Sequence, residues 1–504
     1  MRKTVQFTNI VLLLLVIGYS LLTWPLYTLI GVVALIIGLG IYDLFQTKHT
    51  ILRNFPVIGH LRYLFEMIAP EIHQYFIESD TDGRPISRNQ RTYVYQRAKL
   101  QNDTHPFGSQ LDIHAADYRW MQHSIYPAEQ LSQPPRVLIG GPACMQPYSA
   151  SLFNISAMSY GSLSRNAIEA LNKGAKAGNF FHDTGEGGIS PHHLQGGDLV
   201  YEIGTGYFGC RSEDGNFSPE QFTLQAARPE VKMIEIKISQ GAKPGHGGVL
   251  PASKNTEEIA AIRGVKPHTE VLSPPGHKAF DNADGLLQFV GQLRSLSEGK
   301  PIGFKLCIGS KQEFIEICEA MVRTGIKPDF ITIDGSEGGT GAAPIIFSNF
   351  VGMPWEQGLV FAVDTLRAYD LKQDIRILTA TKIFNAFDIF KALCLGADVC
   401  SSARGMMLAL GCIQALTCNT NTCPTGVATH NPNLVRGLVV EEKWKRVRNY
   451  QHETLLEFLE VFAAAGCTAL DQLHRGFIYL NHEDGVCSYE EVYPTVAVGS
   501  MRTP

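Results

Sequence analysis

From Ser151 onward, the chain alternates between short apolar segments and longer stretches with helical periodicity. Helical patterns such as 284–297 and 311–324 separate most of the candidate strands. The candidate strands are 152–157, 179–182, 233–238, 270–273, 302–307, 330–333, 377–379 and 399–401. Strands that alternate with helices favour a parallel α/β sheet, and about eight such units suit a (β/α)8 TIM barrel. A doubly wound sheet is the competing fold, but the chain lacks the GxGxxG opening typical of it.

The composition fits a globular protein with a sizeable core, because 45% of the 504 residues are hydrophobic and 18% are charged. The net charge is −5 and no block of like charge occurs, so we expect no nucleic-acid partner. The eleven cysteines, several of them in apolar runs, indicate reduced core thiols and ligands in a reducing compartment.

The first part of the chain is unusually apolar, with no charged residue from Thr4 to Tyr42. A single membrane span needs about 20 apolar residues, and this stretch is nearly twice as long and is interrupted at Trp24-Pro25. We therefore predict a transmembrane hairpin within residues 1–48, with spans at about 5–22 and 26–42. A cleaved signal peptide is disfavoured by the length of the run and by the lack of a small-residue cleavage site. A buried hairpin in a soluble core is the remaining alternative.

Basic residues flank both outer ends of this apolar stretch, namely Arg2, Lys3, Lys48 and Arg53. The positive-inside rule then places the N-terminus and the large domain on the cytoplasmic side of the cell membrane. We predict an N-terminal extension at 49–150 that packs on the barrel, the barrel itself at 151–435, and a helical extension at 436–504. Within the first extension, the segment after Pro56 has an amphipathic pattern, which suits either the membrane surface or ordinary packing.

Three cysteines, Cys412, Cys418 and Cys423, follow one another in a Cys-x5-Cys-x4-Cys spacing. Thiolates this close repel one another unless a metal neutralises them, and soft thiolates suit iron–sulfur or zinc centres. Three buried free cysteines are the simpler alternative. A structural zinc site needs four ligands, and His430 is the obvious fourth. The spacing alone does not separate iron–sulfur from zinc.

Loops that follow the predicted strands carry the remaining unusual residues, and active sites of such barrels lie at the C-terminal ends of the strands. A loop of small residues at 156–164 allows the backbone to approach a planar ring closely. Glu186 lies between glycines in the loop 183–190, either as a solvated side chain or as a general acid or base. Lys243 lies on a constrained loop between Gly-Ala and Pro-Gly. Lys305 interrupts an apolar strand and therefore needs an anionic partner.

The run GCIQALTCNTNTCPTGVAT resembles the three-cysteine loop that follows the flavin-binding barrel of glutamate synthases and holds a [3Fe-4S] cluster there. The chain from about 154 to 432 is similar to that family's FMN-binding domain, with several motifs in the same order. The resemblance implies FMN and a [3Fe-4S] cluster as cofactors, with Cys412, Cys418 and Cys423 as the cluster ligands.

The resemblance also implies which residues contact the flavin. MSYG at 158–161 matches the family's first flavin loop, and the glycine-rich run at 334–344 matches the loop packed beside the flavin ring. The implied flavin-binding residues are Met158, Ser159, Tyr160, Gly161, Thr184, Gly185, Lys305, Asp334, Gly338, Gly339, Thr340 and Gly405. For Lys305 the implied partner is the electron-rich edge of the reduced flavin, with a salt bridge inside the barrel as the alternative. Gly405 is preferred over Lys382 for the phosphate, because the loop at 380–382 departs from the family pattern.

Two residues are implied to act on the substrate. Lys243 matches the family lysine that binds a substrate carboxylate. Glu186 matches a glutamate that lies near the substrate, which implies general acid/base or electrostatic work for it. His246 and Val249 replace the family's glutamate and glutamine in the same loop, which leaves the substrate open.

The implied reaction is reductive amination of 2-oxoglutarate, or a related 2-oxo acid, by hydride transfer from reduced FMN to an imine. The family's glutaminase domain and β-helix have no counterpart in this sequence, so we expect ammonia or a glutaminase partner to supply nitrogen. The chain contains no convincing nicotinamide-binding motif, so we expect ferredoxin or an NAD(P)H-oxidising subunit to supply electrons. A flavin-dependent amine or N-substituted glutamate oxidoreductase, and a non-catalytic electron-transfer subunit of a membrane complex, are the alternatives.

Overall fold

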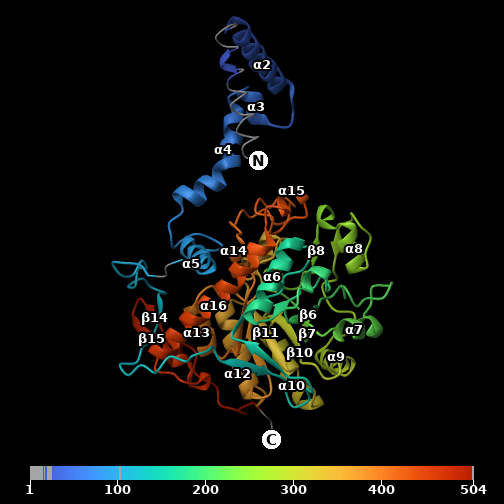
Figure 1. Ribbon diagram of the computed structural model, residues 1–504, viewed down its shortest axis with the longest axis vertical. Helices are drawn as coiled ribbons and strands as arrows, with labels where there is room; N and C mark the ends of the chain where they lie inside the picture. The colour runs from blue at the N-terminus through green and yellow to red at the C-terminus, as the bar shows by residue number, and fades with distance from the viewer. Residues whose placement is uncertain (1–14, 16, 20–24, 102–103, 502–504) are drawn as a thin grey trace. The chain divides into compact units, whose positions relative to one another are not determined.

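The computed structural model describes residues 15, 17–19, 25–101 and 104–501 of the chain. It divides into two compact units, Met1–Arg88 and Asn89–Pro504 (Figure 1). The two units are described separately below.

The larger unit contains a closed barrel of eight parallel strands. In barrel order they are β4 (Phe153–Ile155), β5 (His182–Asp183), β6 (Leu199–Ile203), β7 (Val231–Lys237), β10 (Ile302–Cys307), β11 (Phe330–Asp334), β12 (Arg376–Thr379) and β13 (Val399–Ser402). The last strand closes on the first, with Cys400 opposite Phe153 and Ser402 opposite Ile155. The predicted (β/α)8 barrel is confirmed.

One predicted strand does not belong to the barrel, and one barrel strand was missed. Residues 270–273 contain only β9 (Val271–Leu272), which pairs antiparallel with β8 (Val249–Leu250) outside the barrel. The third barrel strand is β6 instead, and all five of its residues are buried. Glu202 interrupts the apolar run of β6, because this strand turns a carboxylate into the barrel. An apolar pattern alone does not detect such a strand.

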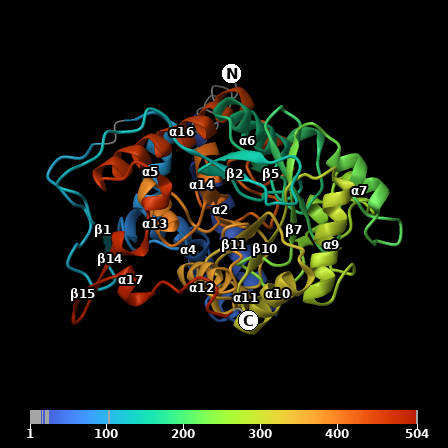
Figure 2. The same ribbon diagram turned by 90° about the horizontal axis from the view of Figure 1, so that it is seen from below.

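Helices surround the barrel, as Figure 2 shows for α6, α9, α10, α12, α13 and α16 around strands β7, β10 and β11. The helices between strands are α6 (Arg165–Gly178), α7 (Pro219–Ala226), α8 (Glu257–Arg263), α9 (Ala283–Leu296), α10 (Lys311–Thr324), α11 (Ile345–Phe350), α12 (Trp355–Ala368), α13 (Ala386–Cys394) and α14 (Arg404–Leu410). Side-chain caps fix where many of them begin. Ser164 accepts from the Ala167 amide at α6, and Asn385 forms a capping box with Asp388 at α13.

An antiparallel hairpin of β2 (Arg136–Ile139) and β3 (Tyr148–Ser151) precedes the barrel. Its Ile139, Tyr148 and Ala150 belong to one buried cluster with residues at or next to the starts of the barrel strands, among them Phe181 and Phe330. The hairpin therefore closes the N-terminal end of the barrel with apolar side chains. Each large one stabilises the fold by about 1.5–3 kcal/mol. Polar chemistry is left to the opposite, C-terminal end.

The C-terminal extension contains the predicted helix and also two strands. Helix α16 (Val440–Ala464) packs against α6, α13 and α14, and Val447 lies where a side chain on Gly174 would be. Strands β14 (Ile478–His482) and β15 (Gly485–Ser488) form an antiparallel sheet with β1 (Arg119–Met121). Helices α15 (Pro432–Val435) and α17 (Tyr489–Val492) are short.

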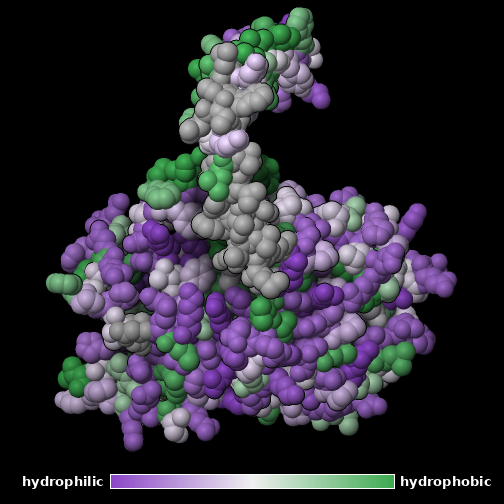
Figure 3. All heavy atoms as spheres, turned by 45° about the horizontal axis from the view of Figure 1, so that its top comes forward, coloured by the Kyte–Doolittle hydropathy of each residue, from purple (hydrophilic) through white to green (hydrophobic). Residues whose placement is uncertain are grey.

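The smaller unit consists of α2 (Pro25–Phe45), α3 (Thr50–Asn54), α4 (Gly59–Ile72) and a π-helical turn, His73–Ile77. Residues Tyr27–Phe45 of α2 are long and apolar enough to cross a membrane by length and composition, with a mean hydropathy of 2.2. Hydrophobic colouring covers much of α2 in Figure 3. This helix includes the second predicted span, 26–42. Most of the first, 5–22, lies outside the described residues, so the hairpin stays a prediction.

A buried ion pair joins the C-terminal extension to the barrel helices. The guanidinium of Arg475 donates to both carboxylate oxygens of Asp364 in α12, at 3.1 and 2.7 Å, and only 5% of the Arg475 side chain is exposed. We expect Arg475→Met to lower the free energy of unfolding by about 3–5 kcal/mol, because Asp364 is left without its partner. Urea denaturation measures this change.

The matched control is Arg323→Met, which removes an arginine paired with Asp284 at 2.7 Å on the surface, where 59% and 43% of the two side chains are exposed. This substitution should cost less than about 1 kcal/mol. Equal effects of the two substitutions would contradict the structural importance of the Arg475 pair.

Candidate functional site

Loops at the C-terminal ends of the barrel strands come together through direct contacts. The Gly241 amide, after β7, donates to Asp334 at the end of β11 at 2.9 Å, and the Thr381 hydroxyl, after β12, donates to the same carboxylate at 2.8 Å. A side chain on Gly241 would overlap the carbonyl oxygen of Gly335. The end of the barrel therefore forms one connected rim.

Glu186, in the loop after β5, is the carboxylate at the centre of this rim. It forms an ion pair with Lys237 at 2.8 Å. Gly204 and Gly248 enclose it, since a Cβ on either would lie 2.6 Å from a carboxylate oxygen. Burial acts to raise the pKa of Glu186, but Lys237, Lys243 and Arg263 lower it overall. Glu186 is therefore ionised and can accept a proton.

Lys243 is 2% exposed, and its ammonium donates to the carbonyl of Gly247 at 2.9 Å. Burial lowers its pKa to about 8, an effect that Glu186 partly offsets. The constrained loop predicted from the sequence is present, because the His246 amide donates back to the Lys243 carbonyl. Lys243 is thus a fixed cation without a carboxylate in direct contact among the described residues.

Two further cations of the rim were missed by the sequence analysis. Lys237 ends strand β7, and Arg263 ends helix α8 with 5% of its surface exposed. Arg263 donates to the Tyr160 carbonyl at 3.2 Å and lies over the ring of Phe208. The position of Lys237 at the C-terminal end of a strand was the signal that could have identified it. Arg263 has no comparable signal, since its helix looks ordinary in sequence.

We refer to Glu186, Lys237, Lys243 and Arg263 as the rim cluster. Three cations share one carboxylate, so the cluster carries an excess of positive charge in a largely buried position. Buried charges need partners of opposite sign. The cluster is therefore built to receive an anion, and carboxylate is a chemistry that fixed cations recognise through charge-assisted hydrogen bonds.

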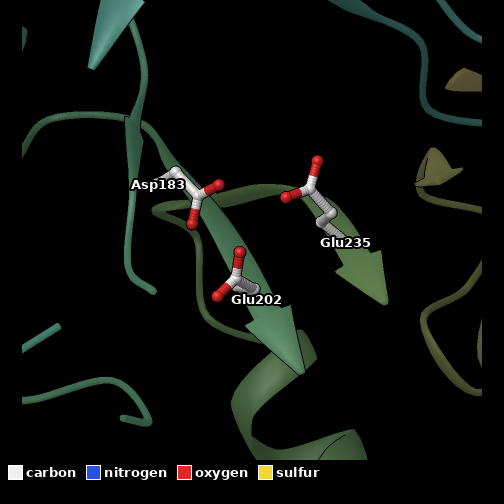
Figure 4. A group of neighbouring side chains, drawn as sticks. All are labelled: Asp183, Glu202 and Glu235. Carbon is white, nitrogen blue, oxygen red and sulfur yellow. The ribbon is translucent and has the colours of Figure 1, made fainter. Parts of the chain in front are cut away.

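Lys305 lies deeper, inside the barrel, among three carboxyl groups. Its ammonium pairs with Glu202 and lies 3.4 Å from Glu235. Asp183 completes the group, and Figure 4 shows the carboxyl groups of Asp183, Glu202 and Glu235 turned toward one another. The barrel-internal salt bridge, the alternative in the sequence analysis, describes the contacts of Lys305. Its role at the flavin edge stays a prediction.

One carboxyl of this group favours its protonated form. Burial raises the pKa of Glu235 well above its usual value, and the neighbouring charge of Asp183 raises it further. The Thr332 hydroxyl donates to Glu235, and the Gly185 amide donates to Asp183 at 2.9 Å. A single lysine does not neutralise three buried carboxylates, and protonation of Glu235 would reduce the excess to one negative charge.

The raised pKa of Glu235 predicts a pH dependence of stability. The stabilisation is complete below the usual pKa of 4.5 and is lost as the pH rises toward the folded value. Glu235→Gln keeps a neutral group of the same shape. We expect its free energy of unfolding relative to the wild type to increase with pH above 4.5, by up to about 1.4 kcal/mol per pH unit. Urea denaturation at several pH values measures the trend.

Glu483→Gln, which removes an exposed carboxylate in the turn between β14 and β15, is the matched control for this substitution. Parallel stability curves for Glu235→Gln and the wild type would show that Glu235 is ionised throughout.

The predicted flavin-binding residues occupy several adjoining positions. The segment Met158–Gly161 packs against Gly185, where a Cβ would lie 2.7 Å from the Ser159 amide nitrogen. Gly338 lies beside Asp334, and Gly339 and Thr340 are exposed. These backbone surfaces without bulky side chains fit a planar ring.

Two of the predicted flavin-binding residues are buried and already engaged. The Thr184 hydroxyl accepts from the Glu202 amide at 3.1 Å, within the barrel wall. The Gly405 amide donates to the Ser402 hydroxyl at 3.2 Å. A Cβ added at Gly405 would lie 2.6 Å from the Tyr450 hydroxyl, so this side of Gly405 is filled. Neither residue offers these groups to a ligand in this arrangement.

The three predicted metal ligands lie in one loop after α14, and all three cysteines are free. Burial raises the pKa of Cys412 to about 11. Burial acts in the same direction on Cys423, but hydrogen bonds from Thr425 and from backbone amides lower its pKa overall. Charges of Cys418 and Cys423 influence the pKa of Cys412, so the thiols are electrostatic neighbours.

The zinc alternative fits this loop poorly. A tetrahedral zinc with Zn–S bonds of about 2.3 Å brings its sulfur atoms to about 3.8 Å from one another. Among the described residues, the group of possible metal ligands whose atoms lie within 4.8 Å of one another is Asp183, Glu202 and Glu235, and it contains no cysteine. The ring of His430, the proposed fourth ligand, bonds to the Gly161 carbonyl at 2.9 Å.

The cysteine loop adjoins the rim directly. Gly341, of the glycine-rich loop after β11, would bring a Cβ to 3.3 Å from Cys418, and the His430 ring contacts Gly161 of the first predicted flavin loop. The Tyr95 hydroxyl in α5 (Arg88–Ala98) donates to the Cys412 carbonyl at 2.6 Å. Predicted flavin loops and predicted cluster ligands therefore share one region.

The rim cluster lies at the C-terminal ends of the strands of a (β/α)8 barrel. This is where the active sites of enzymes with this fold lie. Residues 141–468, more than half of the chain, match the family model described as the conserved region in glutamate synthase. The chain is 37% identical over 503 residues to the "Glutamate synthase large subunit-like protein YerD" of Bacillus subtilis (strain 168), covering 91% of this chain and 95% of that protein. The chain belongs to the glutamate synthase family.

A second relative is the "Archaeal-type glutamate synthase [NADPH]" of Thermotoga maritima, 34% identical over 337 residues, or 66% of this chain. The chain spans 63% of the length of that protein. Among solved structures, it is similar to a flavocytochrome b2 variant with sulfite bound, at a TM-score of 0.43 and 12% identity, covering 83% of this chain and 86% of that one. A mandelate oxidase variant gives a TM-score of 0.42 at 13% identity, covering 84% and 100%.

Proposed function

We propose that this protein is a flavin and iron–sulfur oxidoreductase that forms glutamate, or a related amino acid, from a 2-oxo acid and ammonia. The rim cluster carries this proposal, because three cations and one ionised carboxylate meet at the C-terminal ends of the strands in a member of the glutamate synthase family.

The implied cofactors are FMN and a [3Fe-4S] cluster. Backbone at 158–161, 184–185 and 334–340 would hold the flavin, and Cys412, Cys418 and Cys423 would hold the cluster. Bound FMN supplies hydride transfer, and an iron–sulfur cluster supplies one-electron transfer. The fit rests on small residues in the rim loops and on three free neighbouring thiols.

The residues of the rim cluster have distinct proposed tasks. Lys243, whose ammonium contacts only a backbone carbonyl among the described residues, binds a substrate carboxylate. Arg263 and Lys237 add positive charge, which holds the anionic substrate and keeps Glu186 ionised. Ionised Glu186 accepts a proton as ammonia adds to the oxo carbon. Its protonated form then returns that proton to the oxo oxygen, which leaves as water to give the imine, and reduction of the imine takes a further proton from solvent.

A related oxidoreductase with a different amine or N-substituted substrate is the second candidate. His246 occupies the position of the family's glutamate, and its ring lies edge-on to Phe347 at 5.4 Å between centroids. An imidazole against an aromatic ring offers a flatter and less acidic surface than a carboxylate. Val249 lacks the polar group of the family's glutamine in the same loop, and the loss of that polar contact favours a substrate other than 2-oxoglutarate itself.

The decisive experiment is anaerobic. The protein is purified in mild detergent and reduced chemically. 2-Oxoglutarate and ammonium are then added, while the flavin absorbance and glutamate are followed together. Reoxidation of the flavin with an equal amount of glutamate would establish the reaction. Flavin that stays reduced with 2-oxoglutarate, but is reoxidised by another 2-oxo acid or imine, would select the second candidate. Flavin that stays reduced with all of them would contradict an enzyme of this type.

Lys243→Met tests the carboxylate-binding role. Losing one charge-assisted hydrogen bond costs about 1.5–3 kcal/mol, so we expect KM for the 2-oxo acid to rise about 10- to 100-fold. Steady-state kinetics measure this change, with Lys278→Met, an exposed lysine, as the control. Reduction of an artificial dye should survive in both variants. An unchanged KM would contradict the carboxylate-binding role of Lys243 and would favour electron relay as the function of the protein.

The source of nitrogen and the electron donor belong to the proposal. We propose that free ammonium or a glutaminase partner supplies nitrogen. The "[NADPH]" in the names of the archaeal-type relatives supports a nicotinamide-oxidising subunit as electron donor, and ferredoxin is the alternative.

We also propose that the chain is anchored in the cell membrane by two spans, with its catalytic unit on the cytoplasmic side. The apolar segment Tyr27–Phe45 supports one of these spans. The expected result is that the protein stays in the membrane fraction after alkaline carbonate washing and is released by detergent. Release by carbonate alone would contradict an integral anchor.

A further inference from the structure

Lys254 is a buried cation that no step of the proposed reaction uses. It ends a short 3-10 turn, Ala252–Lys254, in the loop between β8 and α8, and 3% of its surface is exposed. Its ammonium donates to the Ser162 carbonyl at 2.6 Å and to the Cys418 carbonyl at 3.3 Å. Within the described part of the chain, no carboxylate forms an ion pair with it.

A buried ammonium without a carboxylate is expensive, so its surroundings must compensate for it in another way. The cysteine loop supplies part of this compensation, because the carbonyl of Cys418, a predicted cluster ligand, accepts a hydrogen bond from the ammonium.

Lys254 also lies between two functional segments. Ser162 follows the predicted flavin loop 158–161, and Cys418 lies in the cysteine loop. The next residue toward the N-terminus, Ser253, accepts a hydrogen bond from Asn421 of the cysteine loop at 2.9 Å. The turn thus holds the cysteine loop against the rim by two independent contacts.

We propose that Lys254 is a positioning residue that raises the reduction potential of the iron–sulfur centre by placing a buried positive charge beside Cys418. The inference rests on the proposed cluster. Reduction adds negative charge to an iron–sulfur centre, and nearby positive charge stabilises the reduced form. Solvent screens a buried charge weakly, so its effect exceeds that of a surface lysine.

The test compares the midpoint potential of the cluster in full-length variants by redox titration, following the EPR signal of the oxidised centre. Lys254→Gln keeps a side-chain donor for the two carbonyls and removes the charge. At the wild-type midpoint, we expect the ratio of reduced to oxidised cluster to fall at least about tenfold, which corresponds to about 59 mV for one electron.

Two variants separate charge from packing. Lys254→Arg restores the charge and should return the midpoint close to the wild-type value. Lys266→Gln removes an exposed lysine from the same region of the chain and should leave the midpoint unchanged. If Lys254→Gln does not fold, the comparison of Lys254→Arg with Lys254→Met, at matched iron content, asks the same question.

The outcomes are distinguishable from those of the proposed function. Iron and sulfide are quantified first, and wild-type protein without them would overturn the cluster and this inference together. A normal cluster whose midpoint is the same in Lys254→Gln as in the wild type would overturn the inference alone. Equal shifts in Lys254→Gln and Lys254→Arg would reduce Lys254 to a packing role.

Discussion

The charged groups buried inside the barrel constrain which cations are available at the C-terminal ends of its strands. Closure of the sheet turns side chains of β5, β6, β7 and β10 toward one interior, and Asp183, Glu202, Glu235 and Lys305 meet there. The ammonium of Lys305 and the raised pKa of Glu235 both reduce the net negative charge of these buried carboxyl groups. Since Lys305 is engaged there, the rim cluster above it depends on its own cations, Lys237, Lys243 and Arg263.

The sequence predicted the architecture well where a local pattern carries the information. Strands such as 302–307 and 330–333 were located because apolar runs alternate with helices, and those runs are buried in the barrel wall. Strand β6 was missed because its inward-facing Glu202 disguises a fully buried strand as a polar break. The segment 270–273 looked like a strand and is one in part, but its partner is β8 rather than the barrel.

The candidate site was predictable only in part, for a physical reason. Glu186 and Lys243 were predicted because they lie in glycine-rich or proline-flanked loops and because these loops resemble those of a known family. Arg263 and Lys254 lie in ordinary-looking segments, and they matter because folding brings them beside Tyr160 and Cys418, far away in the chain. Burial and long-range partners are properties of the fold, and a sequence read without its tertiary contacts does not contain them.

The sheet formed by β1, β14 and β15 has a consequence for biosynthesis. Trp120, in β1, stacks on Tyr479, in β14, and donates to Asn481, which is 361 residues further along the chain. At ribosomal rates of about 5–20 residues per second, β1 waits roughly 20–70 seconds for its partner to be made. During that time the backbone groups of β1 that later pair with β14 are without their strand partner, which is an edge that another chain can pair with.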